Sequence, residues 1–254
     1  MGSRGRTMAG ALAAALGALA LGVLPAAARA GEPVDLALVL VADVSRSIDE
    51  DEFALQKKGY SAAFADPRVI TAIRAGKRGA IAVSYVEFAA EDEVKTVVDW
   101  TVIRDGESAS LFAEALQNAP RAFEGFTSIS AGIDFAVKRL AALGPAGRRV
   151  IDVSGDGTNN SGRDVTAARD DAVKLGITIN GLTIINPRPS PFGPSHIEPE
   201  GGLTEYYRRN VIGGSRSFVL EVRDFASFGE ALARKLVTEI GKDIADAGAT
   251  ARRF

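Results

Sequence analysis

The segment from Leu36 to Glu50 constrains the fold more than any other part of the chain. An apolar run, Leu36 to Ala42, ends in three oxygen-bearing side chains: Asp43, Ser45 and Ser47. A continuous apolar run of this length indicates a central strand that is covered on both faces. Alternate side chains of an extended segment share a face, so the three oxygens can converge just beyond the strand. A carboxylate and two hydroxyls are hard ligands that suit Mg²⁺, Mn²⁺ or Ca²⁺ and not zinc or copper.

The first 30 residues have the layout of a secretory signal peptide. Two arginines precede an apolar run, Met8 to Leu24, and a small-x-small cleavage site ends at Ala30. We therefore expect residues 1–30 to be removed and the mature chain to be exported, to the periplasm or out of the cell. An uncleaved membrane anchor is the alternative for this segment. No further apolar run of the sequence is long enough to span a membrane.

The charge and the residue types exclude several classes of function. The sequence has 30 basic and 32 acidic residues. Loss of the leader would remove three arginines and no acids, so the net charge of −2 would become −5. A nucleic-acid partner usually requires a basic surface, and we expect none here. Cysteine is absent and His196 is the single histidine, so zinc sites built on thiolate or imidazole are not expected.

Strand-like and helix-like segments alternate along the rest of the chain. Strands are predicted at 36–42, 80–88, 94–102, 149–154, 177–185 and 217–222, and helices at 47–65, 107–118, 128–142, 165–175 and 225–240. The short link between the second and third strands permits only an antiparallel pair. The pattern predicts one α/β domain over 31–254, with a core at about 34–240. Its sheet is expected to be doubly wound, six-stranded and mostly parallel, with one antiparallel edge strand and helices on both faces.

Two further oxygen-rich loops are expected near Asp43 at the same edge of the predicted sheet. One, Gly125-Phe-Thr127-Ser-Ile-Ser130, enters a helix, and the other, Val150 to Gly157 with Asp156, ends the fourth strand. Ligands of open α/β sheets bind beyond the carboxyl ends of the strands, where the strand order reverses. Each residue also has a structural alternative: Ser47, in the predicted capping box Ser47-Ile-Asp-Glu50, and Thr127 can cap helices, and Asp156 can form a turn. Asp43 has no such alternative, because a carboxylate that closes a buried strand needs a partner.

These three loops together resemble those of the von Willebrand factor type A domain. The shared pattern is Asp-x-Ser-x-Ser after an apolar strand, Gly-x-Thr entering a helix, and a strand that ends in Asp-Gly. In that family the three loops form the metal ion-dependent adhesion site, abbreviated MIDAS. The resemblance covers about residues 34–240, and the chain is also similar to an uncharacterised group of exported bacterial proteins that consist of this domain alone. The resemblance to the von Willebrand factor type A domain implies a Rossmann-like fold and these metal ligands: Asp43, Ser45, Ser47, Thr127 and Asp156.

The resemblance implies a binding function. A divalent cation, Mg²⁺ in the first place and Mn²⁺ or Ca²⁺ as alternatives, is expected to leave one position open for an Asp or Glu carboxylate of a protein partner. Hydroxyl ligands neutralise the cation only partly, so that an incoming carboxylate is bound strongly. We expect no catalytic residues and no other cofactor. The alternative is a phosphohydrolase-type enzyme with Asp43 as nucleophile. Haloacid dehalogenase-type enzymes carry a second aspartate as general acid where this chain has Ser45.

Four features of the sequence are explained neither by the predicted binding function nor by the phosphohydrolase alternative. Asp152 lies in the middle of an apolar strand, where it either faces an unseen cation or is partly exposed. Asn159 and Asn160 are predicted to form a polar turn that adds no carboxylate. The proline-rich segment 186–199 is either a rim of the site or a stiff structural loop. His196, within that segment, is expected to face solvent and not to act in catalysis.

Overall fold

The computed structural model describes residues 33–185, 199–223 and 227–251, with side chains up to Gly241. The predicted leader and His196 lie outside the described residues, as does nearly all of the proline-rich segment. The strands are β1 (Val34–Asp43), β2 (Ile81–Phe88), β3 (Val94–Ile103), β4 (Ala146–Gly155), β5 (Thr178–Ile184) and β6 (Val219–Val222). The helices are α1 (Glu50–Ala65), α2 (Pro67–Arg74), α3 (Gly106–Asn118), α4 (Ile129–Leu143), α5 (Val165–Lys174), α6 (Leu203–Tyr206), the π-helical turn η1 (Tyr207–Val211) and α7 (Phe228–Ala251).

The six strands form one sheet in the order β3-β2-β1-β4-β5-β6. Only the pair of β2 and β3 is antiparallel, and all the other neighbours are parallel. The chain builds outward from β1 to the β3 edge, and then returns to β4 and builds toward the β6 edge. The strand order therefore reverses between β1 and β4, and the predicted doubly wound sheet is confirmed.

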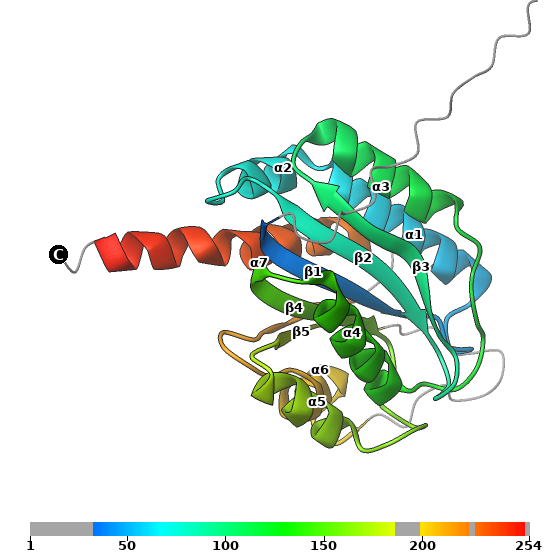
Figure 1. Ribbon diagram of the computed structural model, residues 1–254. Helices are drawn as coiled ribbons and strands as arrows, with labels where there is room; N and C mark the ends of the chain where they lie inside the picture. Colours follow the sequence, from blue (N-terminus) through cyan, green and yellow to red (C-terminus); the bar gives the residue numbers. More distant parts are fainter. Residues whose placement is uncertain (1–32, 186–198, 224–226, 252–254) are drawn as a thin grey trace, which may run out of the picture.

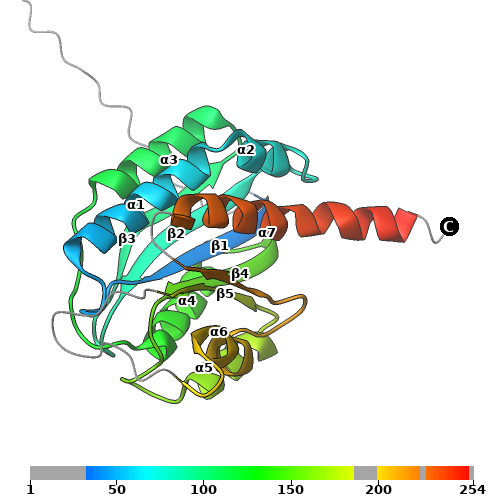
Figure 2. The ribbon, with the colours of Figure 1, turned by 180° about the vertical axis from the view of Figure 1, so that it is seen from behind.

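β1 is the centre of the core because all ten of its residues are buried. Leu36, Leu38 and Leu40 face one side of the sheet and pack with α1, α2, α3 and α7. Val39 and Val41 face the other side and pack with α4, α5 and η1. Figure 1 and Figure 2 show these two layers of helices on opposite faces of the sheet. A polar side chain within such a strand needs a partner inside the protein, whereas one at its carboxyl end can face the loops beyond the sheet.

The predicted capping box of α1 is wrong by two residues. The N-cap is Asp49, whose carboxylate accepts from the backbone N–H of Glu52, while the Glu52 carboxylate accepts from the N–H of Asp49. Both registers of the sequence carry a capping-box pattern, and the later one forms. The Ile48 N–H instead donates to the Ser45 carbonyl in a turn that precedes the helix. Ser47 therefore does not cap a helix.

Two helical segments were not predicted. Asp66-Pro67, expected as a helix end or a turn, ends α1 and also begins α2, with Asp66 as N-cap and Pro67 in the first turn. Proline is well suited to that position because its missing N–H has no partner there in any case. The second segment, Leu203–Val211, comprises α6 and η1. Its four-residue and five-residue turns are too short to produce a helical repeat of apolar residues in the sequence.

The last helix, α7, packs on the sheet with its first part and extends past the edge of the sheet with its second part (Figure 1). It contains 24 residues. Among the residues that the structure describes, neither α7 nor any other helix combines the length and the apolar character needed to cross a membrane.

A buried ionic cluster joins α7 to β4 and β5. The Lys235 ammonium lies 2.5 Å from Oδ1 of Asp152 and 2.7 Å from Oε1 of Glu239. The Asn180 amide donates to the same Glu239 oxygen at 2.6 Å. All four side chains are at most 1% exposed. Asp152 therefore faces a cation from the chain itself, and the alternative of a partly exposed position is wrong.

Two carboxylates share one ammonium in this cluster, so protonation is expected to be unusual. Burial raises the pKa of Asp152 to about 7, and the negative charge of Glu239 adds to the effect. Burial alone would lower the pKa of Lys235, but the charges of Asp152 and Glu239 outweigh it and raise that pKa. Lys235 is thus held as a cation, while a proton is retained on Asp152 toward neutral pH.

Replacing Asp152 by asparagine tests this protonation. Because the pKa is raised in the folded state, the native protein holds a proton that the unfolded chain releases at about pH 4. The stability that Asp152 contributes is therefore fully present below about pH 4 and is lost as the pH rises to about 7. Relative to Asp152→Asn, the wild type should lose free energy of unfolding over that interval, as measured by urea denaturation at several pH values.

A control of opposite sign is available at Asp171. Hydrogen bonds from Arg163 and Lys174 lower the pKa of this exposed carboxyl, so its contribution is lost as the pH falls. Relative to Asp171→Asn, the wild type should therefore lose stability toward low pH. A wild type that gains stability relative to Asp152→Asn as the pH rises would mean that Asp152 is ionised in the folded state.

Candidate metal centre

The structure brings all five predicted site residues together at the carboxyl ends of β1 and β4. Their side chains form one chain of hydrogen-bonded oxygens. The Thr127 hydroxyl donates to Oγ of Ser45 at 3.0 Å, the hydroxyls of Ser45 and Ser47 lie 3.1 Å apart, and the Ser47 hydroxyl donates to Oδ1 of Asp156 at 2.8 Å. Asp43 joins the group through Oδ1, which accepts from the Ser45 N–H at 2.8 Å.

The five side chains are buried to different degrees. Asp43 and Ser45 are fully buried, and Asp156 and Thr127 are only 3% and 5% exposed. Ser47 is half-buried, which makes it the member of the group that is most accessible to solvent. The site is thus closed on the side of the sheet and reached from the loops above it.

A partly buried arginine holds the loop between β1 and α1 in place. Nη2 of Arg121 donates to the carbonyls of Val44, Ser45 and Ile48 at 2.7, 3.1 and 2.9 Å. The Gln56 amide donates to the carbonyl of Asp43 at 3.2 Å. These donors satisfy the carbonyls of a tight turn that has no strand partner. The sequence did not reveal this role of Arg121, because the residue lies more than 70 positions from the carbonyls that it binds.

The segment that carries Thr127 is anchored to β2 and to the loop after it. The N–H of Ala122 donates to the Glu87 carboxylate at 2.8 Å, and the N–H of Ser128 donates to the carbonyl of Ala89 at 2.7 Å. Burial raises the pKa of Glu87. Ser128, and not Thr127, is the N-cap of α4, so the alternative role of Thr127 as a cap is wrong. Its hydroxyl is directed into the site instead.

Asn159 and Asn160 link the loop after β4 to the Thr127 segment. Oδ1 of Asn160 accepts from the N–H of Thr127, and Oδ1 of Asn159 accepts from the N–H of Ser130, both at 2.9 Å. The two asparagines add no carboxylate, as predicted, but they form more than a polar turn. The signal in the sequence was a pair of adjacent amides directly after Asp156-Gly157-Thr158. Two amides can each accept one N–H from a neighbouring loop.

Tyr207, at the start of η1, lies behind the two carboxylates. Its ring and hydroxyl are fully buried, and the hydroxyl has no hydrogen-bond partner among the described residues. Burial raises the pKa of Tyr207 well above its usual value, and the negative charges of Asp43 and Asp156 raise it further. Single π-helical turns often occur at functional sites. The sequence missed Tyr207 because the short helical segment around it was not predicted.

Gly155 leaves space between Tyr207 and Asp43. A Cβ atom at this position would lie 2.7 Å from the Tyr207 hydroxyl and 2.9 Å from Oδ2 of Asp43. Both distances are below those at which a carbon and an oxygen pack. Glycine at the end of β4 is therefore required for the tyrosine hydroxyl and the carboxylate to approach one another.

The chemistry of the donors fits a hard cation. The set of two carboxylates and three hydroxyls contains only oxygen ligands, gathered within hydrogen-bond distance of one another. Such ligands suit Mg²⁺, Mn²⁺ or Ca²⁺. The residues present therefore fit a divalent hard cation in donor type.

A family model described as "Protein of unknown function (DUF1194)" matches residues 33–244. This span contains all six strands and the five side chains of the site. The chain belongs to this family. The description of the DUF1194 family states no activity, so the family assignment leaves the function to be argued from the site.

Solved structures show which fold the DUF1194 chain has. Proximal thread matrix protein 1 from the mussel byssus is 16% identical, with a TM-score of 0.58, over 82% of this chain and 48% of that chain. A von Willebrand factor type A protein from Catenulispora acidiphila is 18% identical, with a TM-score of 0.55, over 82% and 43%. BatB from Bacteroides thetaiotaomicron is 18% identical, with a TM-score of 0.51, over 82% and 99%.

At these identities the likeness shows the fold alone, and the von Willebrand factor type A fold predicted from the sequence is confirmed. The DUF1194 chain spans less than half the length of the mussel and Catenulispora chains. A second structure of the mussel protein, 18% identical with a TM-score of 0.57, has a zinc-occupied MIDAS motif. A comparison with curated proteins found no match.

Replacing Gly155 by alanine tests the geometry of the site. The added methyl would displace the Tyr207 hydroxyl or the Asp43 carboxylate, so Gly155→Ala should reduce the rise in melting temperature that Mg²⁺ produces. The double variant Gly155→Ala/Tyr207→Phe removes one of the two close contacts and should recover part of that rise. Differential scanning calorimetry with and without Mg²⁺ measures both effects.

The matched control is Gly106→Ala in the first turn of α3. A Cβ atom at this position meets nothing within 4 Å, so the response to Mg²⁺ should not change. A Gly155→Ala variant that responds to Mg²⁺ like the wild type would show that the space beside Asp43 is not needed for metal binding.

Proposed function

We propose that this protein is an exported, divalent-metal-dependent binding domain that engages an Asp or Glu carboxylate of a protein partner. The proposed ligands are the five oxygen side chains described above. The bound cation would supply a Lewis-acidic position for the partner's carboxylate. Mg²⁺ is the first candidate, and Mn²⁺ and Ca²⁺ are the alternatives.

One observation carries the proposal: hydroxyl and carboxylate oxygens from three separate loops converge at the reversal of strand order. Thr127, Ser45 and Asp156 come from segments that the fold brings together and that neighbouring residues lock in place. A helix cap or a turn would need only one of these residues. Five side-chain oxygens would leave one position of an octahedral cation open, where an added anionic ligand can bind.

The surrounding residues hold the ligands and do not supply catalytic groups. Arg121 is occupied with three backbone carbonyls, and Gln56 is occupied with the carbonyl of Asp43. Ser45 stands where haloacid dehalogenase-type enzymes carry an aspartate as general acid, and its side chain is fully buried. The mussel protein with its zinc-occupied MIDAS motif supports a metal at this place in the fold. These observations favour binding over the phosphohydrolase alternative.

Metal titration tests the proposal. A cation that binds only the native state at 100 times its Kd adds about 2.7 kcal/mol of stability, which raises the Tm of a domain of this size by roughly 5–10 °C. Mg²⁺ or Mn²⁺ should produce such a rise in the wild type, and Asp43→Ala should abolish it. Calorimetry with each of Mg²⁺, Mn²⁺, Ca²⁺ and Zn²⁺ in turn would establish the preference among metals.

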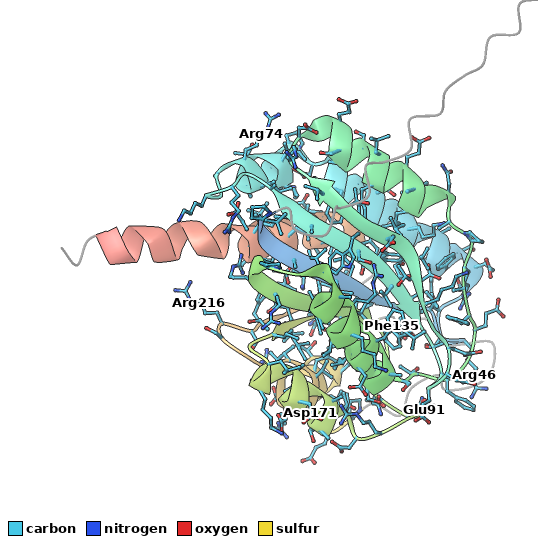
Figure 3. The ribbon with its side chains drawn as sticks, viewed as in Figure 1. Arg46, Arg74, Glu91, Phe135, Asp171 and Arg216 are labelled. Carbon is cyan, nitrogen blue, oxygen red and sulfur yellow. The ribbon has the colours of Figure 1, made fainter. Side chains whose placement is uncertain are left out.

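Glu91→Ala is the matched control for the loss of a carboxylate. Glu91 is exposed and lies at the same end of the molecule, as Figure 3 shows, but it takes no part in the chain of oxygens. Its removal should leave the metal response intact. An equal rise in the wild type and Asp43→Ala, or no rise in either, contradicts a metal site at Asp43. Phosphatase activity that Asp43→Asn abolishes would instead support the enzymatic alternative.

A further inference from the structure

An exposed arginine and an exposed phenylalanine adjoin the candidate metal centre. Arg46 stands between the two ligands Ser45 and Ser47, and Phe126 directly precedes the ligand Thr127. The guanidinium carbon of Arg46 lies 4.2 Å from the centre of the Phe126 ring. Phe126 is 51% exposed, and in the part of the chain that the structure describes only Leu175 is a comparably exposed large apolar residue. The pair therefore forms part of the surface around the site.

The two residues are fixed in position by the same contacts that build the site. The Arg46 N–H donates to the carbonyl of Gly125 at 3.0 Å and ties the two loops together. Arg121 fixes the backbone on either side of Arg46 through the carbonyls of Ser45 and Ile48. The stack of guanidinium on ring needs no further support, because a cation over an aromatic face is itself attractive.

Within the described ranges, the guanidinium of Arg46 contacts the Phe126 ring and makes no hydrogen bond or ion pair. Arg163 and Arg121, at the same edge of the sheet, are occupied by carboxylates: Arg163 by Asp134 and Asp171, and Arg121 by Glu50. A guanidinium that stacks on a ring through its face keeps its N–H groups directed outward, in the fork that matches a carboxylate.

Several exposed carboxylates also lie at this edge. Glu91, Asp92 and Glu124 are exposed in loops at the carboxyl ends of the strands. Figure 3 shows Arg46 and Glu91 at one end of the molecule and Arg74 and Arg216 at the other. A partner with many acids would be repelled by these carboxylates. A partner with a second acid placed over Arg46 would meet a cation at that point.

We propose that Arg46, stacked on Phe126, binds a second carboxylate of the partner, so that the site recognises a peptide segment with two acidic side chains. This inference rests on the proposed function: one carboxylate completes the coordination of the metal ion, and the other pairs with Arg46. Phe126 acts as a positioning residue that holds the guanidinium and shields one of its faces from water. The acids near the site disfavour a third acidic residue in the segment.

Selection from a random peptide library tests the inference. Phage-displayed peptides are bound to the full-length chain in Mn²⁺ and eluted with EDTA, so that only metal-dependent binders are recovered. The recovered peptides should carry two acidic residues. Changing the second acid to its amide should weaken binding to the wild type roughly ten- to hundredfold, as expected for the loss of a charge-assisted hydrogen bond.

Charge reversal at Arg46 makes the test specific. Arg46→Glu should lose affinity for the two-acid peptides and should gain affinity for the same peptides with lysine in place of the second acid. Phe126→Ala should show a smaller loss that depends on the presence of the second acid. Arg74→Glu, an exposed arginine at the opposite end of the molecule, changes the net charge equally and should have no effect. The Mn²⁺-induced rise in Tm of each variant verifies that the fold and the metal site are retained.

The outcomes separate the two proposals. Metal-dependent peptides that carry a single acid, and that bind the wild type and Arg46→Glu equally, would overturn the role of Arg46 and leave the metal-dependent binding function standing. If no peptide is eluted by EDTA from a protein that does bind Mn²⁺, the carboxylate-binding function fails, and the role of Arg46 fails with it.

Discussion

The complete burial of β1 is the constraint on which the rest of the structure depends. All ten residues are covered on both faces, so a polar side chain of this strand meets the loops beyond the sheet only at the carboxyl end. Asp43 is placed there, and the turn that follows exposes backbone carbonyls that no strand pairs with. Gln56 on α1 and Arg121 in the loop before α4 donate hydrogen bonds to these carbonyls. The candidate metal centre therefore lies where the protein ends its most buried strand.

The protein contains two kinds of buried carboxylate, and they are compensated differently. Asp152, in the middle of β4, has its cation in Lys235, which α7 inserts toward the sheet. Asp43 and Asp156 lie at strand ends among hydroxyls, which can ligate a metal as well as donate a hydrogen bond. An internal lysine closes the first group and fixes the position of α7. The second group keeps an accessible side at Ser47, which is what a binding site requires.

The sequence was sufficient to predict the sheet, its one antiparallel pair and the five residues that meet at its edge. The sheet and its antiparallel pair follow from apolar runs and link lengths, and the meeting of the loops follows from the rule that strand order reverses at a ligand crevice. The choice of the five residues came from the resemblance to the von Willebrand factor type A domain. It was not sufficient for contacts that depend on tertiary structure. Arg121, Tyr207 and Lys235 act on groups far away in the chain, and no local pattern marks them. The capping box was misplaced because Ser47 and Asp49 both begin an acceptable pattern, and the choice depends on the Ser47 hydroxyl being held by Asp156.

The division between buried ligands and exposed neighbours also determines where specificity can arise. Asp43, Ser45, Thr127 and Asp156 are buried, so a partner can meet them only through whatever completes the coordination. A carboxylate alone carries little information about the molecule that presents it. Discrimination must therefore come from side chains that surround the opening, and within the described residues Arg46 on Phe126 is the cation there that is both exposed and fixed. Because Arg46 lies between two proposed ligands, Ser45 and Ser47, the proposed metal binding and partner selection would depend on three consecutive residues.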